Sequence, residues 1–227
     1  MISPTLLQSI VRARAGEPGG SWLEQTCASA GKDVDALCGA YTAASARVGR
    51  SSIQLDAALR QPFASVDLDV SRWTTDDAAR AALLLSAAAG LSADALADAA
   101  AACYERGDAR EQQSWLRAVS LLPDPARFLR LTIDACRTNI IPVFEAIACE
   151  NPYPSRYFPE RNFNQMVLKS LFNSIALTRI VDLPTRLNAE LSRMAGDYAA
   201  ERRAAGRTVP ADIGLAMMES GSAGVMR

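Results

Sequence analysis

RTNIIPVFEAIACENPYPSRYFPERNFNQMVLKSLFNSIALTR, residues 137–179, contains two helical patterns that flank a turn punctuated by prolines. Asn139 is suited to cap the first helix, which would begin at Ile140. Pro159 fits the first position of the second helix, because its missing N–H group is not needed there. Apolar residues then recur at helical spacing and form one face: Phe163, Met166, Val167, Leu171 and Ile175. The stretch therefore predicts two helices joined by a short connection.

The connection carries polar and aromatic residues in place of the alanine and leucine that fill the other helices. Prolines follow Asn151, Tyr153 and Phe158, and a residue that precedes proline is biased toward extended backbone. We expect a stiff, exposed turn that fixes the directions of Tyr153, Arg156 and Tyr157. Because rigid loops with such side chains often carry binding sites, this turn is the first candidate for one.

Helical patterning also covers most of the remaining chain. Residues 75–137 predict four helices of about 14 residues, and the short breaks between them make successive helices antiparallel neighbours. The expected capping residues are Thr74 or Thr75, Ser92, Asp108 and Asp124, with Asn188 for a later helix. Toward the N-terminus we expect a short amphipathic helix that GEPGGS (residues 16–21) breaks, a second helix near Trp22 and a third from Asp33. An extended connection is expected over residues 49–74.

Together these elements predict an all-α fold, a compact multi-helix bundle of antiparallel helix pairs with solenoid-like packing in a single domain. Residues 1–74 would form N-terminal helices and an irregular connection, and residues 75–218 the main helical body. Residues 219–227 are predicted to be a flexible tail.

Composition excludes several classes of function. With a net charge of −1, the chain lacks the basic surface that nucleic-acid binding by phosphate neutralisation requires. It contains no histidine, which excludes Ser-His and Cys-His catalysis and His-ligated zinc within this chain, and we expect no metal and no cofactor. No apolar run is long enough for stable membrane insertion, and the N-terminus does not resemble a secretory signal, so a cytoplasmic location is expected. Five cysteines, none in a CxxC motif, fit buried thiols in a reducing compartment.

The polar residues of residues 137–179 are the candidates for binding a ligand or a partner. They are Arg137, Asn139, Glu145, Asn151, Tyr153, Arg156, Tyr157, Glu160, Asn164, Gln165, Lys169 and Arg179. A structural role is open for some of them. Gln165 and Lys169 belong to a polar stripe along the predicted helix, and such a stripe is also what a solvent-exposed face without any binding role would show. Asn164 falls among apolar positions, where it needs a buried partner such as a neighbouring turn that it caps.

At fixed separations along this stretch stand RTNIIPVFEAIACENPYP and FPERNFNQMVLKSLF, followed by MAGDYAAERRAAGRTVPADI at residues 194–213. In these motifs the chain resembles the EboA family, the first component of the ebo gene clusters of bacteria and cyanobacteria. The resemblance covers roughly Cys136 to Ile213, and the motif region is taken as 137–213. The N-terminal half matches only as generic alanine-rich helix.

The resemblance implies a helical accessory protein of a secondary-metabolite cluster. Such clusters encode a prenyltransferase-like membrane protein, a metal-dependent hydrolase, a sugar-phosphate-isomerase-like protein and a synthase-like protein. In cyanobacteria they are linked to export of precursors of a sunscreen pigment. The partners it implies are other ebo-cluster proteins or a small-molecule pathway intermediate, bound through residues 137–179. No catalytic residue comes with the resemblance, and the oligomeric state stays open.

An enzyme is the alternative hypothesis. It would act without a metal on a small polar or anionic metabolite, using the glutamate, tyrosine and lysine side chains of this stretch. Convergence of Glu145, Glu160, Tyr153, Tyr157 and Lys169 on one pocket would distinguish it from a binding protein.

Overall fold

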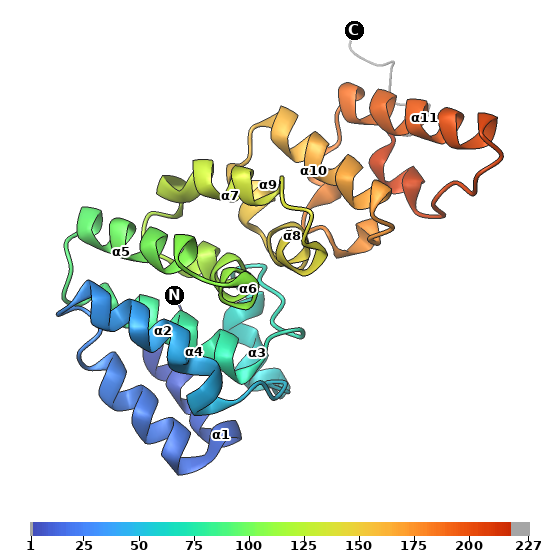
Figure 1. Ribbon diagram of the computed structural model, residues 1–227. Coiled ribbons are helices and arrows are strands. Elements are labelled where there is room, and N and C mark those ends of the chain that lie inside the picture. The colour runs from blue at the N-terminus through green and yellow to red at the C-terminus, as the bar shows by residue number, and fades with distance from the viewer. Residues whose placement is uncertain (1, 219–227) are drawn as a thin grey trace, which may run out of the picture. The chain divides into compact units, whose positions relative to one another are not determined.

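A computed structural model describes residues 2–218, and in this part of the chain the fold is all-α, as predicted (Figure 1). The described residues contain α-helices and short 3₁₀-helices, and their only β-pairing is an isolated bridge between Ser52 and Thr74. The contacts divide the chain into two compact units, Met1–Ile147 and Ala148–Arg227. The boundary that the sequence suggested at residue 74 lies inside the first unit. The predicted flexible tail, residues 219–227, lies outside the described residues.

The first unit is built around α4. Its α-helices are α1 (Pro4–Cys27), α2 (Val34–Val48), α3 (Ala57–Ala64), α4 (Thr75–Ala87), α5 (Ala93–Glu105), α6 (Ala109–Ala118), α7 (Leu129–Ala135) and α8 (Ile141–Ala148), the last ending at the unit boundary. Nearly every residue of α4 is buried, and α1, α2 and α6 pack against it (Figure 1). The 3₁₀-helices η1 (Val119–Leu121) and η2 (Pro125–Phe128) lead from α6 into α7.

Most of the helix starts that the sequence predicted from capping residues agree with the structure. The side chains of Ser92, Asp108 and Asn188 each accept a hydrogen bond from a backbone N–H of the first turn, as the sequence predicted, and Asp33 caps α2 in the same way. Thr74 and Asp77 form a capping box at the start of α4. These predictions are confirmed because capping depends only on residues a few positions apart. The expected cap at Asp124 is wrong, because its backbone is left-handed and its side chain accepts no capping hydrogen bond.

Two N-terminal predictions need correction. The break at residues 16–21 is a kink at Gly16, whose positive φ of 72° interrupts an otherwise continuous α1. The connection over residues 49–74 contains the short helix α3, which Asp56 caps and which includes Pro62. A helix of two turns with an internal proline gives too weak a periodic signal to be recognised from sequence.

The second unit contains α9 (Tyr153–Tyr157), α10 (Glu160–Phe172) and α11 (Ala189–Ala204), with η3 (Leu177–Arg179), η4 (Leu183–Arg186) and η5 (Ile213–Ala216) between and after them. The predicted apolar face of α10 is buried along its length, although Ile175 lies just beyond the helix end. The predicted exposed proline turn is wrong. Its residues form α9, and Asn151 to Pro154 are buried.

A local Asx turn helps α9 to form despite its prolines. The Oδ1 atom of Asn151 accepts a hydrogen bond from the backbone N–H of Tyr153 at 3.0 Å, and Pro154 stands in the first turn, where no N–H is needed. The Tyr153 ring packs against Tyr157 and Phe158 at centroid distances of 4.7 and 6.2 Å. Aromatic packing therefore buries a segment that its polar composition had suggested was exposed.

Candidate functional site

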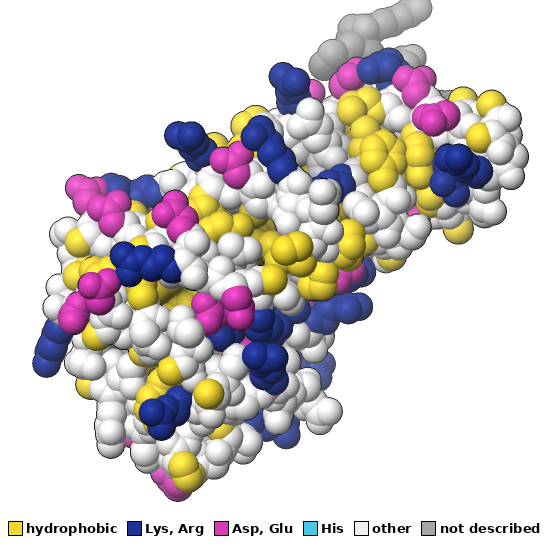
Figure 2. Space-filling view, viewed as in Figure 1, with side chains coloured by type: hydrophobic (Ala, Val, Ile, Leu, Met, Phe, Trp, Pro, Cys, Tyr) yellow, Lys and Arg dark blue, Asp and Glu magenta, His cyan; other side chains and the backbone are white. Residues whose placement is uncertain are grey.

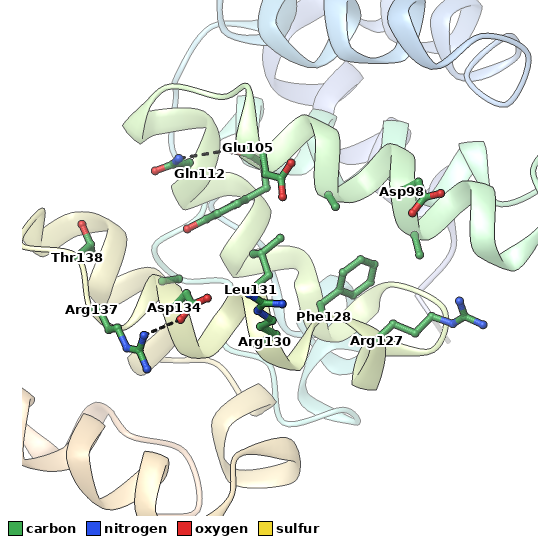
Figure 3. Close-up of a pocket in the computed structure, with 14 residues that line it drawn as sticks. Asp98, Glu105, Gln112, Arg127, Phe128, Arg130, Leu131, Asp134, Arg137 and Thr138 are labelled. Atoms are coloured by element: carbon green, nitrogen blue, oxygen red, sulfur yellow. Dashed lines mark hydrogen bonds and ion pairs between the residues drawn. The ribbon is translucent and has the colours of Figure 1, made fainter.

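A groove of about 800 Å³ lies in the first unit between α5 and the segment formed by η2 and α7 (Figure 3). Its volume falls in the range of small-molecule sites. The lining residues are Ala97, Asp98, Ala101, Tyr104, Glu105, Gln112, Arg127, Phe128, Arg130, Leu131, Asp134, Ala135, Arg137 and Thr138.

Aromatic packing beneath the groove holds its two sides in place. The indole Nε1 of the buried Trp115 donates a hydrogen bond of 2.8 Å to the carbonyl of Ala100 in α5. The Trp115 ring also contacts Tyr104 and Phe128, with ring centroids 5.2 and 5.1 Å apart. One anchored tryptophan thus contacts α5 on one side and η2 on the other. The floor is therefore apolar and fixed by a single core residue.

The two sides of the groove carry opposite charges. The lining residues of α5 include the carboxylates Asp98 and Glu105 and no cation. The opposite side contributes Arg127, Arg130 and Arg137, which extend from η2, α7 and the segment after it (Figure 3). Asp134 is the one carboxylate on that side. The groove is thus acidic along one edge and mainly basic along the other.

Some of these charges are paired within the unit. Arg127 contacts Asp124 at 2.7 Å and Asp94 of α5 at 2.5 Å, and Arg137 contacts Asp134 at 3.0 Å. No hydrogen bond or ion pair of the described residues engages the charged groups of Asp98, Glu105 or Arg130, which are exposed. These three groups are accessible to a ligand.

Tyr104 supplies a neutral hydroxyl group at the floor. Burial raises the pKa of Tyr104 to about 12, with a further contribution from the nearby Cys136 and Asp134. The hydroxyl therefore stays protonated at neutral pH and can donate a hydrogen bond to a ligand. The lining includes no cysteine or histidine, so its chemistry is that of hydrogen bonds, charges and apolar contact.

Of the twelve residues predicted from the sequence, Arg137 lines the groove. Asn139 is exposed just beyond it, and Glu145 is half-buried in α8. The other nine belong to the second unit. Sequence reasoning therefore identified one residue of this groove and missed the carboxylates and arginines around it.

Several predicted residues of the second unit hold its fold together. The side chains of Asn164 and Asn188 exchange two hydrogen bonds of 3.0 Å, and Asn188 also caps α11. The expected structural partner of Asn164 is thus the cap residue of the next helix. Arg179 forms a bidentate pair with Glu150, with distances of 2.7 and 2.9 Å.

The remaining candidates are spread over α9 and α10. Arg156, Glu160 and Gln165 are exposed, while Tyr157 and Lys169 are half-buried. None of the twelve except Arg137 lines the groove, and none lines a cavity of about 470 Å³ between the end of α10 and residues 208–212. The convergence of glutamate, tyrosine and lysine that the enzyme hypothesis requires does not occur in either cavity.

Arg186 is a residue of the second unit that sequence reasoning missed. Its guanidinium group donates to the carbonyls of Pro154, Ser155 and Phe158, which lie in and just after α9. It also lies over the ring of Phe163, 4.5 Å from the centroid. Arg186 thereby ties α9 to α10 and to η4.

A buried cluster of charges in the first unit was also missed. Asp76, Asp77 and Arg80 of α4 are essentially inaccessible to solvent, and Arg110 and Arg117 of α6 complete the cluster. The sequence had indicated only a helix cap at Asp76 and Asp77. Two aspartates and an arginine one turn later, set among alanine pairs and leucines, are the signal that such a cluster leaves in a sequence.

We expect this cluster to make the stability of the first unit depend on pH. Burial would raise the pKa of Asp76, but hydrogen bonds from Arg110, Thr74 and Ser45 and the charge of Arg110 outweigh it and hold the pKa well below its usual range. The unfolded chain binds this proton near pH 4, so the stabilisation is present above that pH and is lost as the pH falls below it. Urea unfolding between pH 5 and pH 2.5, followed by fluorescence, should show this loss, and Asp76→Asn should flatten it. Equal slopes for the two proteins would contradict the assignment.

No helix of residues 2–218 combines the length and apolar character that crossing a membrane requires. Over the same residues, no group of three or more acidic or cysteine side chains is placed to hold a metal ion.

A family model described as metabolite traffic protein EboA matches residues 3–218, which extends the resemblance seen in residues 136–213 to nearly the whole chain. No curated protein matches the chain, and no solved structure does.

Proposed function

We propose that this chain, which belongs to the EboA family, binds a small polar metabolite in the groove between α5 and α7. The family description, metabolite traffic, fits a protein that holds and passes on a small molecule. On this proposal the protein is a cytoplasmic accessory component of an ebo-type cluster, and the metabolite leaves unchanged.

The observation that carries the proposal is the combination of a sizeable groove with unpaired charged groups. The charged groups of Asp98, Glu105 and Arg130 are exposed and have no partner in the part of the chain that the structure describes, and Phe128 and Tyr104 form the floor beside them. Ligand sites in proteins share this composition of apolar surface with a few polar groups that fix orientation. Arg137, at the start of the motif region, belongs to the same groove.

Filling the groove should abolish retention of the metabolite. Ala101 lines the groove from α5, so Ala101→Phe places a ring in the groove. The lower helix propensity of phenylalanine costs less than about 1 kcal/mol, which α5 can tolerate. We expect wild-type protein purified from its host to retain a small molecule. Ala101→Phe should retain at most about a tenth as much, because a loss of only about 1.4 kcal/mol in binding free energy weakens the affinity tenfold. Mass spectrometry of the released molecules measures this.

Ala93→Phe is the matched control, because Ala93 is an exposed residue of the same helix that does not line the groove. Equal retention by Ala101→Phe and Ala93→Phe would refute the proposed site. Release of a chemically altered molecule after incubation with the wild type would instead favour the enzyme hypothesis.

Binding of a partner protein is the second candidate function. Apolar side chains gather over α10 and α11 (Figure 2), where Phe172 is 58% exposed and its ring meets that of Tyr198 at 4.7 Å. Exposed aromatic patches of this kind are common at protein interfaces. In the same purification, a protein retained by Ala101→Phe and lost from Phe172→Ser would support this second function. If Phe172→Ser retains the same proteins, this surface is not the docking site.

A further inference from the structure

The charge pattern of the groove indicates what kind of metabolite fits it. We infer that the ligand is a zwitterion whose cationic group lies against Glu105 or Asp98, which are two helical turns apart on α5, and whose anionic group lies against Arg130 of α7. Its apolar part would contact the floor at Phe128 and Tyr104. This inference rests on the proposed function, since it concerns the same groove.

The first argument is the separation of charge across the groove. All lining charges of α5 are negative, and three of the four lining charges on the opposite side are positive. A ligand with a single charge would find one favourable edge and one unfavourable edge. A ligand with both signs is complementary to both edges at once.

The second argument is that the protein already joins the two edges at one end of the groove. There the guanidinium group of Arg127, from η2, reaches the carboxylate of Asp94, one turn before Asp98 in α5, at 2.5 Å. Farther along lie Asp98, Glu105 and Arg130 (Figure 3), whose charged groups have no such partner among residues 2–218. A zwitterion placed there would bridge the edges in the way that the Arg127–Asp94 pair does.

The third argument concerns the floor. The hydroxyl of Tyr104 and the amide of Gln112 lie on the lining, together with Phe128, Leu131 and Ala101. An apolar floor with charges of opposite sign at the edges matches a molecule that joins an apolar body to an ammonium group and a carboxylate. A fully hydrated sugar-like molecule would leave this floor without a complementary surface.

Three dansyl probes that share one aromatic body test the inference. Nε-dansyl-lysine carries an ammonium group and a carboxylate, dansylcadaverine only the ammonium group, and 6-(dansylamino)hexanoate only the carboxylate. Fluorescence titration at low salt and neutral pH should show Nε-dansyl-lysine binding most tightly. We expect each charged contact to contribute up to about fivefold in affinity, the range of exposed ion pairs.

Charge-neutralising variants make the test reciprocal. The double variant Asp98→Asn/Glu105→Gln should weaken binding of the two probes with an ammonium group and spare the hexanoate probe. Arg130→Gln should weaken binding of the two probes with a carboxylate and spare dansylcadaverine. Arg161→Gln, an exposed arginine of α10 outside the groove, is the control that should change none of them.

The outcomes separate the inference from the proposed function. The zwitterion inference is overturned if the three probes bind with equal affinity, or if the charge-neutralising variants do not weaken the probes as predicted. In either case, weaker probe binding by Ala101→Phe would still support a binding groove. If no probe binds, or if Ala101→Phe binds all three unchanged, the groove is not a ligand site and both proposals fall.

Discussion

We expect Arg80→Met to lower the free energy of unfolding of the first unit by about 3–5 kcal/mol, the range found when one partner of a buried ion pair is removed. The guanidinium group of Arg80 is 1% exposed and contacts Asp76 at 2.9 Å. Its other N–H groups donate to the carbonyl of Tyr41 and to the hydroxyls of Ser45 and Ser114. Methionine fills much of the volume but removes the hydrogen bonds that the guanidinium group donates to Asp76, Tyr41, Ser45 and Ser114 inside the unit.

Fluorescence can follow this unfolding selectively, because all three tryptophans, Trp22, Trp73 and Trp115, lie in the first unit. Arg106→Met is the matched control. Arg106 pairs with Asp35 at the same distance of 2.9 Å, but the two side chains are 62% and 84% exposed. An exposed pair contributes at most about 1 kcal/mol, so urea unfolding should separate the two variants clearly. Similar losses for both would show that the cluster is not the buried anchor of α4.

In the second unit, we expect Arg186→Ala to cost about 2–3 kcal/mol, because hydrogen bonds from a charged group are stronger than neutral ones. Three carbonyls in and just after α9 lose the hydrogen bond from the guanidinium group, and the contact of that group with the Phe163 ring is lost as well. Arg186→Lys should recover only part of this, since a lysine cannot reproduce the planar fork of donors. Faster hydrogen exchange at residues 153–158 in urea-free buffer measures the effect.

The control for Arg186 is Arg161→Ala, because Arg161 is exposed on α10. A surface substitution of this kind should change the stability by less than about 0.5 kcal/mol. If Arg186→Ala exchanges no faster than Arg161→Ala, the guanidinium group does not hold α9 in place.

Local signals in the sequence predicted the fold class and many helix starts. Asp108 and Asn188 were recognised because a cap and its backbone donor are within three residues of each other. The helix α9 was not recognised, because a rule about residues before proline cannot include the packing of Tyr153 against Tyr157 and Phe158. The position of α9 also depends on Arg186, which donates to the carbonyls of Pro154 and Phe158 from 32 and 28 residues away and which the local sequence does not specify.

The site was harder to predict for the same reason. Asp98, Glu105 and Arg130 each look like a solvated position on a helix, and only the packing of α5 beside α7 makes them the edges of one groove. Conversely, Asn164 stood out because it falls among the apolar positions of its helix, and Arg179 because it is a charged residue of the stretch at 137–179. Their partners, Asn188 and Glu150, lie 24 and 29 residues away and explain them structurally.

The central claim is that the groove between α5 and α7 holds the metabolite. A crystal structure of wild-type protein carrying the molecule retained from its host tests this most directly. We predict electron density for that molecule over Phe128, within hydrogen-bonding distance of Glu105 or Asp98 on one edge and Arg130 on the other. Density for the molecule against α9 and α10, with the groove filled only by water, would contradict the account.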